Sequence, residues 1–270
     1  MSGTVSPQHN ASSTLFQRIF STLRAELRWI INSLMPVHCP LCMAELTPST
    51  PAETTATARP PLLCPTCRSN LRARAPACCP RCDEPYISAS TTNHLCPRCI
   101  KDPPAFIWLK TATIFNETAA QAVHQFKYNG KTTLAAALTQ CMLQQLEQEI
   151  RAFGPQLIVP VPLHITRLRQ RGYNQSLLLA RNLARQLNLP IANNILKRTR
   201  ATNSQTQLSA RQRHHNLRNA FTCAALPRAQ RILLVDDVVT TTATARACAR
   251  ALQAQGHSVA VVALARATLT

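Results

Sequence analysis

Acidic residues are missing from a long part of this sequence. None occurs between Ile150 and Val235, and from Arg151 to the last residue the only acids are Asp236 and Asp237, against seventeen lysines and arginines. In that part of the chain, a carboxylate acting as general acid or base must therefore belong to this pair. The 270 residues carry a formal net charge of +19 at pH 7, which favours a polyanionic partner: nucleic acid, anionic lipid or a phosphorylated metabolite. A uniformly basic proteome gives the same balance, so charge alone does not choose among these partners.

Aromatic residues and long apolar runs are also scarce. Aromatics make up 4% of the chain, so the core must consist of Leu, Ile, Val and Ala side chains. The most apolar N-terminal stretch, residues 15–35, is interrupted by three arginines and a glutamate, which excludes a membrane span, and it lacks the form of a secretory signal. Residues 1–37 are therefore expected to comprise a disordered start and an amphipathic helix. This helix either packs on its own domain or makes a peripheral membrane contact.

Cysteine, in contrast, is concentrated in residues 38–102. With no export signal we expect a cytoplasmic protein, and in that reducing compartment clustered cysteines bind metal more often than they form disulfides. Eight of the nine cysteines in this region form four Cys-x-x-Cys pairs: Cys39 and Cys42, Cys64 and Cys67, Cys79 and Cys82, Cys96 and Cys99. Proline follows the first cysteine of every pair, which indicates one turn repeated four times.

Eight thiolates at this spacing predict two structural zinc ions, each held by four cysteines, in a double zinc ribbon. Four thiolates leave no open coordination position, so a catalytic metal is not expected. The first two pairs are expected to share one ion and the last two pairs the other. A crossed pairing uses the same residues and stays open.

The remaining residues, 103–270, have the pattern of an α/β domain. Short apolar runs alternate with helix-length stretches, and their continuous apolar character is typical of parallel strands buried on both faces. Strands are predicted at Ala105–Phe115, Leu157–Val161, Arg231–Val235 and Ser258–Leu264, and helices at Gln175–Leu187 and Thr241–Gln255. The final strand, helix and strand predict a right-handed βαβ unit in a parallel sheet flanked by helices.

The strongest chemical signal lies between the strand ending at Val235 and the helix after it. Four apolar residues lead into Asp236 and Asp237, and a Thr-rich turn follows. Backbone N–H groups, hydroxyls and the positive end of a helix dipole suit a phosphate, and acids at a strand's carboxyl end can accept hydrogen bonds from ribose hydroxyls. The simpler interpretation is a helix capped by Thr240 or Thr241. The predicted binding residues are Asp236, Asp237, Thr240, Thr241, Thr242, Ala243 and Thr244.

This segment resembles the signature of the phosphoribosyltransferases, with Thr242 where the signature normally has glycine, a change expected to reshape the loop. Other segments resemble the ComF (competence protein F) family: Phe126–Lys131 (FKYNGK), Val159–Pro162 (VPVP), Arg171–Gln175 (RGYNQ) and the stretch from Arg198 to Phe221. The similarity covers residues 15–266. It implies a type I phosphoribosyltransferase-like domain that binds 5-phosphoribosyl-1-diphosphate with Mg²⁺, preceded by a zinc ribbon. It also implies a link to DNA uptake in natural transformation.

A group of arginines follows the VPVP segment. Arg167, Arg169 and Arg171 alternate with other residues and are predicted to form a flexible basic loop. Such a loop can close over a diphosphate and Mg²⁺, for which Arg167 and Arg171 are the candidates, or it can follow a single DNA strand. The candidate nucleic-acid contacts are Arg167, Arg169, Arg171, Arg198, Arg200 and Arg213.

Three functions fit these features. The first is a competence protein with little or no enzymatic activity that binds phosphoribosyl diphosphate and single-stranded DNA. The second is an active phosphoribosyltransferase of nucleotide metabolism with an unidentified acceptor, and the third is a metabolite-sensing adaptor that binds other DNA-uptake proteins through its zinc module. By the resemblance, purine-salvage members carry a third acid where this chain has Thr240, so a 6-oxopurine transferase is not expected. Basicity favours the first function, and the intact acid pair keeps the second open.

Overall fold

The computed structural model describes residues 37–46, 62–86, 92–199 and 220–267. It comprises two compact units, residues 1–64 and residues 65–270. The predicted N-terminal amphipathic helix lies outside the described residues, and so do Arg200 and Arg213. None of the helices in the described ranges combines the length and the apolar character that a membrane span requires. The domain boundaries after residues 37 and 102 stay a prediction.

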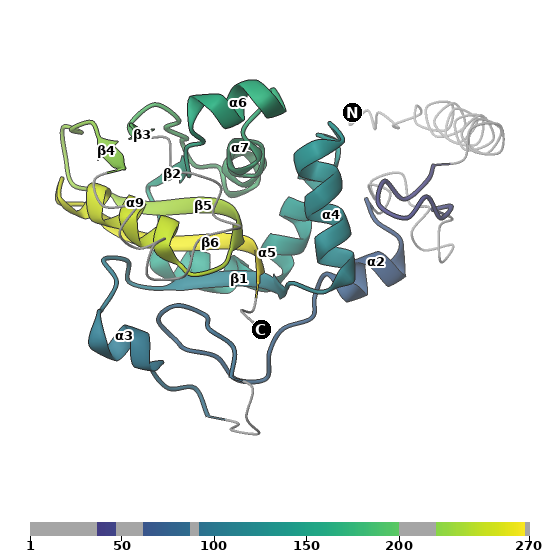
Figure 1. Cartoon of the computed structure of the whole chain (residues 1–270), viewed down its shortest axis with the longest axis horizontal. Coiled ribbons are helices and arrows are strands. Elements are labelled where there is room, and N and C mark those ends of the chain that lie inside the picture. Colours follow the sequence, from purple (N-terminus) through teal and green to yellow (C-terminus); the bar gives the residue numbers. More distant parts are fainter. Residues whose placement is uncertain (1–36, 47–61, 87–91, 200–219, 268–270) are drawn as a thin grey trace, which may run out of the picture. The chain divides into compact units, whose positions relative to one another are not determined.

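A four-stranded parallel sheet forms the centre of the second unit (Figure 1). Its strands lie in the order β1 (Leu109–Ile114), β6 (Ser258–Arg266), β5 (Arg231–Val239) and β2 (Leu157–Pro160). All three strand pairs are parallel, which confirms the predicted fold class. Strands β5 and β6 are longer than predicted, because their ladder continues as far as Val239 and Arg266. Asp236 and Asp237 therefore lie within β5, close to its end.

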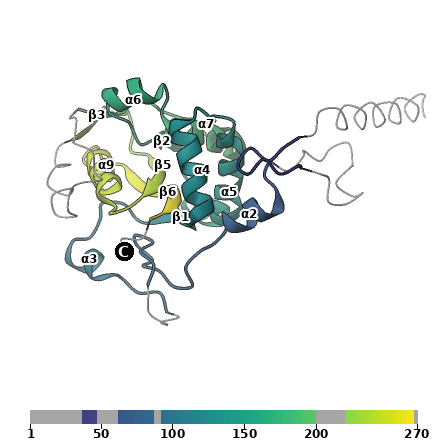
Figure 2. The ribbon, with the colours of Figure 1, turned by 45° about the vertical axis from the view of Figure 1, so that its right-hand side comes forward.

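Helices cover both faces of this sheet (Figure 2). Besides two short helices in the cysteine-rich region, the elements outside the sheet are α4 (Glu117–Tyr128), α5 (Leu134–Phe153), α6 (Ile165–Arg171), α7 (Gln175–Leu187), α9 (Ala243–Gln253), β3 (Leu196–Arg198) and β4 (Phe221–Cys223). Helix α5 packs on β1 and β6, and α7 packs on β5 and β2, so these two helices share one face. Helix α9 packs on β5 and β6 from the other side, next to a small antiparallel sheet of β3 and β4.

Two of the four cysteine pairs form the same tight turn. The N–H of the first cysteine donates to the carbonyl oxygen five residues later, at 2.7 Å for Cys39 and 2.9 Å for Cys79, and the residue after the second cysteine is left-handed. The other two pairs differ, because short helices begin at their prolines: α2 (Pro65–Asn70) and α3 (Pro97–Lys101). The predicted fourfold repeat of one turn is therefore wrong. Two turns alternate with two short helices, and proline suits the first turn of these helices.

The second ribbon, defined as residues 73–102, completes the cover of the sheet. Its four paired cysteines belong to the same buried apolar cluster as Leu109 of β1, Val261 of β6 and Leu252 of α9. Helix α9 packs on β5 and β6, so the ribbon covers the part of this face near β1. A parallel sheet needs both faces buried, and here a cysteine module takes the place of a second helix.

The second ribbon also covers the open edge of β1. The N–H of Leu109 donates to the carbonyl of Arg81 at 2.9 Å, and the N–H of Ile114 donates to the carbonyl of Ala73 at 2.7 Å. These N–H groups belong to an outer strand, whose unpaired backbone groups would otherwise be available for pairing with another chain. The ribbon thus satisfies the backbone of β1 as well as burying its side chains.

A buried carboxylate fixes this contact. Asp83 is 6% exposed, and its Oδ2 accepts hydrogen bonds from the N–H of Thr111 at 2.8 Å and from the hydroxyl of Thr111 at 2.6 Å. Nitrogens of Arg74 and Lys110 lie 3.6 and 3.7 Å from its Oδ1. Because Asp83 directly follows Cys82, the turn that positions the thiolates also presents this carboxylate to β1. Aspartate is among the residues that tolerate the left-handed conformation, φ 58°, found at this position.

Replacing Asp83 by alanine should lower the free energy of unfolding by about 2–4 kcal/mol, because two buried donors of Thr111 lose their acceptor. Urea unfolding followed by circular dichroism measures this change. Asp83→Asn is the matched control: it keeps an oxygen acceptor and a residue that tolerates positive φ, so it should lose less than half as much. Equal losses in the two variants would show that the ion pairs, and not the bonds to Thr111, hold the ribbon on β1.

Candidate functional site

The acid pair lies near the carboxyl end of β5, and local donors orient both carboxylates. Asp236 Oδ1 accepts hydrogen bonds from the Asp237 N–H at 2.9 Å and from the hydroxyl of Ser176 on α7 at 3.1 Å. Asp237 Oδ1 accepts a hydrogen bond from the N–H of Val238 at 2.7 Å. The two residues are 8% and 9% exposed. These bonds fix the carboxylates at the edge of the sheet where parallel α/β folds bind ligands.

Lys127, at the end of α4, is the cation that faces this pair. Its Nζ lies 2.8 Å from Asp237 Oδ2. The lysine offsets one of two adjacent negative charges that would otherwise repel each other in a buried position. Lys127 had no predicted role, although it lies in the FKYNGK segment that is shared with the ComF family. That shared segment was the signal in the sequence that could have identified it.

Burial and the neighbouring carboxylate of Asp237 raise the pKa of Asp236 from 3.8 to about 7. The Asp237 N–H and the charge of Lys127 act in the opposite direction. Because the folded pKa exceeds the unfolded one, the stability that this group contributes is complete below pH 3.8 and is lost as the pH rises through about 7. Hydrogen-bond donors or a cation bound at the pair would favour the ionised form again.

Three threonines connect β5 to α9. The helix begins at Ala243, later than predicted, and the residue before it, Thr242, has φ 59° and ψ 0°. Neither Thr240 nor Thr241 is the N-cap, and the side chain of Thr242 makes no capping hydrogen bond. The first N–H groups of α9 thus receive no cap from this side chain, so the start of the helix suits an anion. The other predicted loop residue, Thr244, lies in the first turn of α9.

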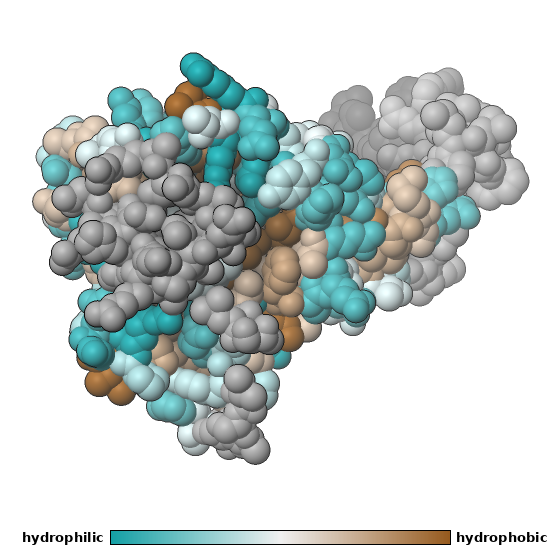
Figure 3. All heavy atoms as spheres, in the orientation of Figure 1, coloured by the Kyte–Doolittle hydropathy of each residue, from teal (hydrophilic) through white to brown (hydrophobic). Residues whose placement is uncertain are grey.

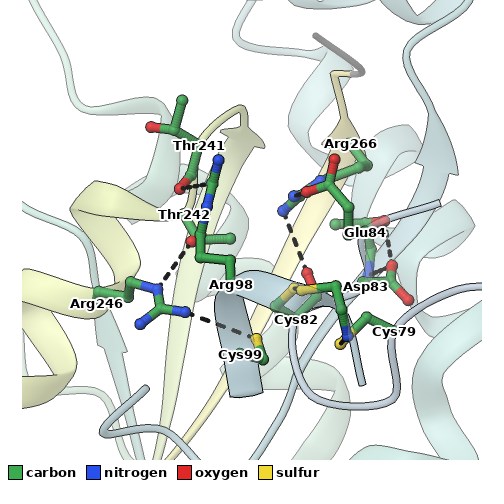
Figure 4. Close-up of polar contacts among 12 residues, drawn as sticks. Cys79, Cys82, Asp83, Glu84, Arg98, Cys99, Thr241, Thr242, Arg246 and Arg266 are labelled. Carbon is green, nitrogen blue, oxygen red and sulfur yellow. Dashed lines mark hydrogen bonds and ion pairs between the residues drawn. The ribbon is translucent and has the colours of Figure 1, made fainter. Parts of the chain in front are cut away.

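Two arginines anchor this turn (Figure 4). Arg98 of α3 donates to the carbonyl of Thr241 at 3.1 Å, and Arg246 of α9 donates to the hydroxyl of Thr242 at 3.2 Å. Arg98 belongs to the second ribbon, so the cysteine module contacts the predicted phosphate loop directly. Neither arginine was a predicted site residue, because a chain this rich in arginine gives no sequence signal that distinguishes them.

Arg167, Arg169 and Arg171 lie in helix α6, and the predicted flexible loop is wrong. The ring of His164 accepts a first-turn N–H at 3.3 Å, and Gly172 with φ 78° ends the helix. Residues four apart share a helical face, so Arg167 and Arg171 project from one side and Arg169 from another. Hydrophilic residues cover most of the surface over α6 in the view of Figure 3.

Arg171 packs on an exposed aromatic ring. Its Cζ lies 5.1 Å from the ring centroid of Tyr128, its Nη2 donates to the Tyr128 hydroxyl at 3.3 Å, and its Nη1 donates to the side chain of Gln175 at 3.2 Å. Tyr128 is 60% exposed and follows Lys127 at the end of α4. The end of α4 therefore links the acid pair, through Lys127, with the arginines of α6, through Tyr128.

Arg198, another predicted nucleic-acid contact, lies in strand β3. Its guanidinium lies 5.6 Å from the ring centroid of Phe221. Burial, together with the charge of Arg167, lowers the pKa of Arg198. The residue is half-buried, so only part of it is open to a nucleic acid at the surface.

The paired cysteines form two groups of four, in the predicted order. Within each group the sulfur atoms lie within 4.8 Å of one another: Cys39, Cys42, Cys64 and Cys67, and Cys79, Cys82, Cys96 and Cys99. The sulfurs of Cys42 and Cys64 are 3.5 Å apart, and those of Cys82 and Cys96 are 3.6 Å apart. Tetrahedral zinc with bonds of about 2.3 Å needs sulfurs about 3.8 Å apart, whereas a disulfide needs about 2 Å. Both groups can therefore hold zinc.

The electrostatics of the second group favour a bound cation if its sulfurs are thiolates. Burial raises the pKa of Cys82 and of Cys99, and the charges of the neighbouring cysteines add to the rise at Cys82, whereas at Cys79 backbone hydrogen bonds outweigh burial and lower the pKa. Four thiolates in one buried place are unfavourable without a positive ion among them. A dication reverses that balance and keeps the coordinating sulfurs deprotonated.

Comparison with known proteins agrees with this geometry. Residues 174–268 match the family model of the phosphoribosyl transferase domain. The chain is 36% identical over 197 residues to the DNA utilization protein YhgH of Salmonella typhimurium, covering 72% of this chain and 85% of that protein. It is 32% identical over 223 residues to competence protein F of Haemophilus influenzae, covering 76% of this chain and 96% of that protein.

A purine phosphoribosyltransferase of Pyrococcus horikoshii Ot3 also aligns with the structure, covering 48% of this chain and 82% of that chain. At 14% identity and a TM-score of 0.32, that likeness carries no argument. The family model supports the site instead, since the residues that it matches, 174–268, include the acid pair, the threonine turn and α9. With its parallel sheet, its phosphoribosyl transferase match and its two cysteine groups, the chain belongs to the family of competence protein F and the YhgH DNA utilization proteins.

Proposed function

We propose that this protein acts in DNA uptake by binding phosphoribosyl diphosphate with Mg²⁺ at the acid pair and single-stranded DNA on its basic surface. Two zinc ions stabilise its cysteine modules, and its place of action is the cytoplasm, with natural transformation as the process. Other DNA-uptake proteins are its protein partners. The observation that carries the proposal is the acid pair at the end of β5 beside the start of α9. The names of the relatives support the process.

The β5–α9 turn supplies the groups that a phosphorylated ribose requires. The carboxylates of Asp236 and Asp237 are acceptors for hydrogen bonds from two neighbouring ribose hydroxyls. The residues from Thr240 to Thr244 offer hydroxyls and N–H groups to the phosphate at the positive end of α9. Magnesium bound with the diphosphate supplies two positive charges that offset its negative charge.

Lys127 adapts this site to ligand binding. In the ligand-free protein its ammonium group lies on Asp237. A ribose hydroxyl or a cation that takes over Asp237 releases the lysine, which then offers its charge to the diphosphate. Arg167 and Arg171, on one side of α6, are the further cations for that group.

Single-stranded DNA fits the surface formed by α6 and the end of α4. Such DNA is bound without sequence preference where arginines neutralise phosphates and exposed aromatic rings stack on bases. Arg167 and Arg169 supply charge on α6, while the exposed ring of Tyr128 is already packed against a guanidinium. A base can stack on the same ring or on the arginine plane.

Metal analysis of the full-length protein, purified without chelator, should find one zinc ion for each of the two cysteine groups. Cys39→Ser and Cys79→Ser should each lose about one equivalent, because structural zinc needs four protein ligands. Cys141→Ser, which removes a buried thiol of α5 outside both groups, should keep both ions. Metal-free protein with quantitative disulfides would contradict the zinc assignment.

The double variant Asp236→Asn with Asp237→Asn should bind phosphoribosyl diphosphate and Mg²⁺ about ten- to a thousandfold more weakly than wild type, because charge-assisted hydrogen bonds to the ribose are lost. Isothermal titration calorimetry measures the affinities. Glu147→Gln, which removes an exposed carboxylate of α5, is the control and should bind as wild type does. Equal affinity in the double variant and the control would remove the ribose from the acid pair.

Single-stranded DNA should bind with strong salt dependence. Replacing Arg167, Arg169 and Arg171 by alanine should flatten the slope of log affinity against log salt by up to about two, at about 0.7 for each DNA phosphate that is no longer neutralised. Fluorescence anisotropy with a labelled oligonucleotide over a salt series measures the slope. The control removes the same charge elsewhere, at the exposed residues Arg181, Arg185 and Arg228. If both triple variants show the same slope, α6 is not a specific contact for DNA.

A further inference from the structure

The proposed phosphate loop contains a residue in a conformation that its side chain disfavours. Thr242 is 3% exposed and has φ 59°. A β-branched side chain crowds the backbone in the left-handed region, whereas glycine adopts that region freely. The other non-glycine residues with positive φ in the described part of the chain are Met43, Asp83 and Asn188, none of them β-branched. Something in the fold must therefore hold Thr242 in place.

Arg246 is the residue that holds it. Its Nε donates to the hydroxyl of Thr242 at 3.2 Å, across one turn of α9. Arg246 is fully buried, with 0% of its surface exposed, so its guanidinium cannot exchange this bond for water. The hydroxyl that a glycine would lack is thus the attachment point that fixes the turn.

The rest of the Arg246 guanidinium is bound by the second ribbon. Its Nη1 donates to the carbonyl of Asp102 at 2.6 Å and lies 3.1 Å from the Asp102 carboxylate, and its Nη2 lies 3.6 Å from the sulfur of Cys99. Figure 4 shows the side chain of Arg246 between Thr242 and Cys99. One planar group therefore joins the phosphate loop to a predicted zinc ligand.

The charge of Arg246 explains why these partners are needed. A fully buried guanidinium requires negative charge nearby. The Asp102 side chain is 54% exposed and is partly screened by water. Zinc held by four thiolates would keep a net negative charge, and the second cysteine group would then supply the remaining counter-charge.

A second hydrogen bond also joins the second ribbon to the phosphate loop. Arg98, which lies between Cys96 and Cys99 in the ribbon, donates to the carbonyl of Thr241 at 3.1 Å. The cysteine module thus binds Thr241 directly through Arg98, and it contacts Thr242 indirectly, through Arg246 of α9. Arg98 is exposed, so this hydrogen bond can be removed by mutation without disturbing the packing of the core.

We propose that Arg246 is a positioning residue through which the second zinc ribbon sets the affinity of the phosphate loop. The ribbon binds the guanidinium, the guanidinium holds Thr242 in the left-handed conformation, and that conformation presents the loop to the phosphate. Arg98 supports the same geometry at Thr241. This inference rests on the proposed binding of phosphoribosyl diphosphate, and it adds the cysteine module to the ligand site.

A double-mutant cycle in the full-length protein tests the inference. Arg246→Met should weaken the calorimetric affinity for phosphoribosyl diphosphate with Mg²⁺ about tenfold, as loss of a charge-assisted hydrogen bond implies. Glycine needs no anchor to adopt positive φ, so in the Thr242→Gly background the same change should cost no more than about threefold. An equal loss in both backgrounds would overturn the role of Arg246 at Thr242.

Arg266→Met is the matched control. Arg266 is 1% exposed and binds the same ribbon, donating to the carbonyl of Cys82 at 3.2 Å and pairing with Glu84. It should lower the melting temperature as Arg246→Met does, yet change the affinity by less than about twofold, since general destabilisation does not act on the loop. If Arg266→Met weakens binding as much as Arg246→Met, Arg246 has only a structural role.

Two further measurements cover the remaining outcomes. If Arg246→Met does not fold, the affinity of Arg98→Gln is compared with that of wild type, because Arg98 is exposed and also bonds to the loop. Its affinity should fall about threefold, and unchanged affinity would overturn the inference. If wild type itself does not bind the ligand, the proposed function fails. The contact between Arg246 and Thr242 is then tested by hydrogen exchange of the peptide that contains residues 241–244, without ligand. Arg246→Met should speed this exchange and Arg266→Met should not. Equal exchange rates in the two variants would by themselves overturn the claim that Arg246 holds Thr242 in place.

Discussion

The rest of this structure depends on one constraint: both faces and the outer strand of the parallel sheet must be covered. Parallel strands must be buried on both faces, and an outer strand must have its backbone satisfied. Helices α5 and α7 meet the first requirement on one side, but α9 alone packs on β5 and β6 on the other. The second ribbon completes that face and binds the edge of β1 with Arg81, Asp83 and Ala73. A cysteine module is thereby part of the core of the α/β fold.

The same docking explains how a chain with so few acids buries its cations. From Arg151 onward only the pair in β5 is acidic, yet Arg246 and Arg266 are almost completely buried there. Their partners are carbonyls, a thiol and carboxylates of the second ribbon, with Asp102 for Arg246 and Glu84 for Arg266. The acidic complement of the basic half therefore lies earlier in the sequence. This leaves Asp236 and Asp237 uncommitted to the packing of the ribbon.

Local patterns predicted the parallel strands and the helices α7 and α9, but they missed α4 and α5 and misplaced several junctions. The bounds of α7 and the strand signals of β2, β5 and β6 follow from apolar periodicity, and the cysteine groups follow from spacing. The α6 helix was missed because seven residues with few apolar positions give no periodic signal. The start of α9 was misplaced because threonines normally cap helices, whereas here an arginine one turn later holds Thr242 in a conformation that propensity disfavours. The contacts of Lys127 with Asp237, of Arg98 with Thr241, and of Arg246 with the second ribbon span long sequence separations, which no local pattern reports.

The cover of β1 also decides what happens to a chain whose ribbon comes loose. The N–H groups of Leu109 and Ile114 would then face solvent along an unpaired strand, and such an edge recruits a strand from another molecule. A chain with a detached ribbon would therefore expose β1 to intermolecular β-augmentation. Zinc bound by the second cysteine group would then protect the sheet from self-association without contacting it.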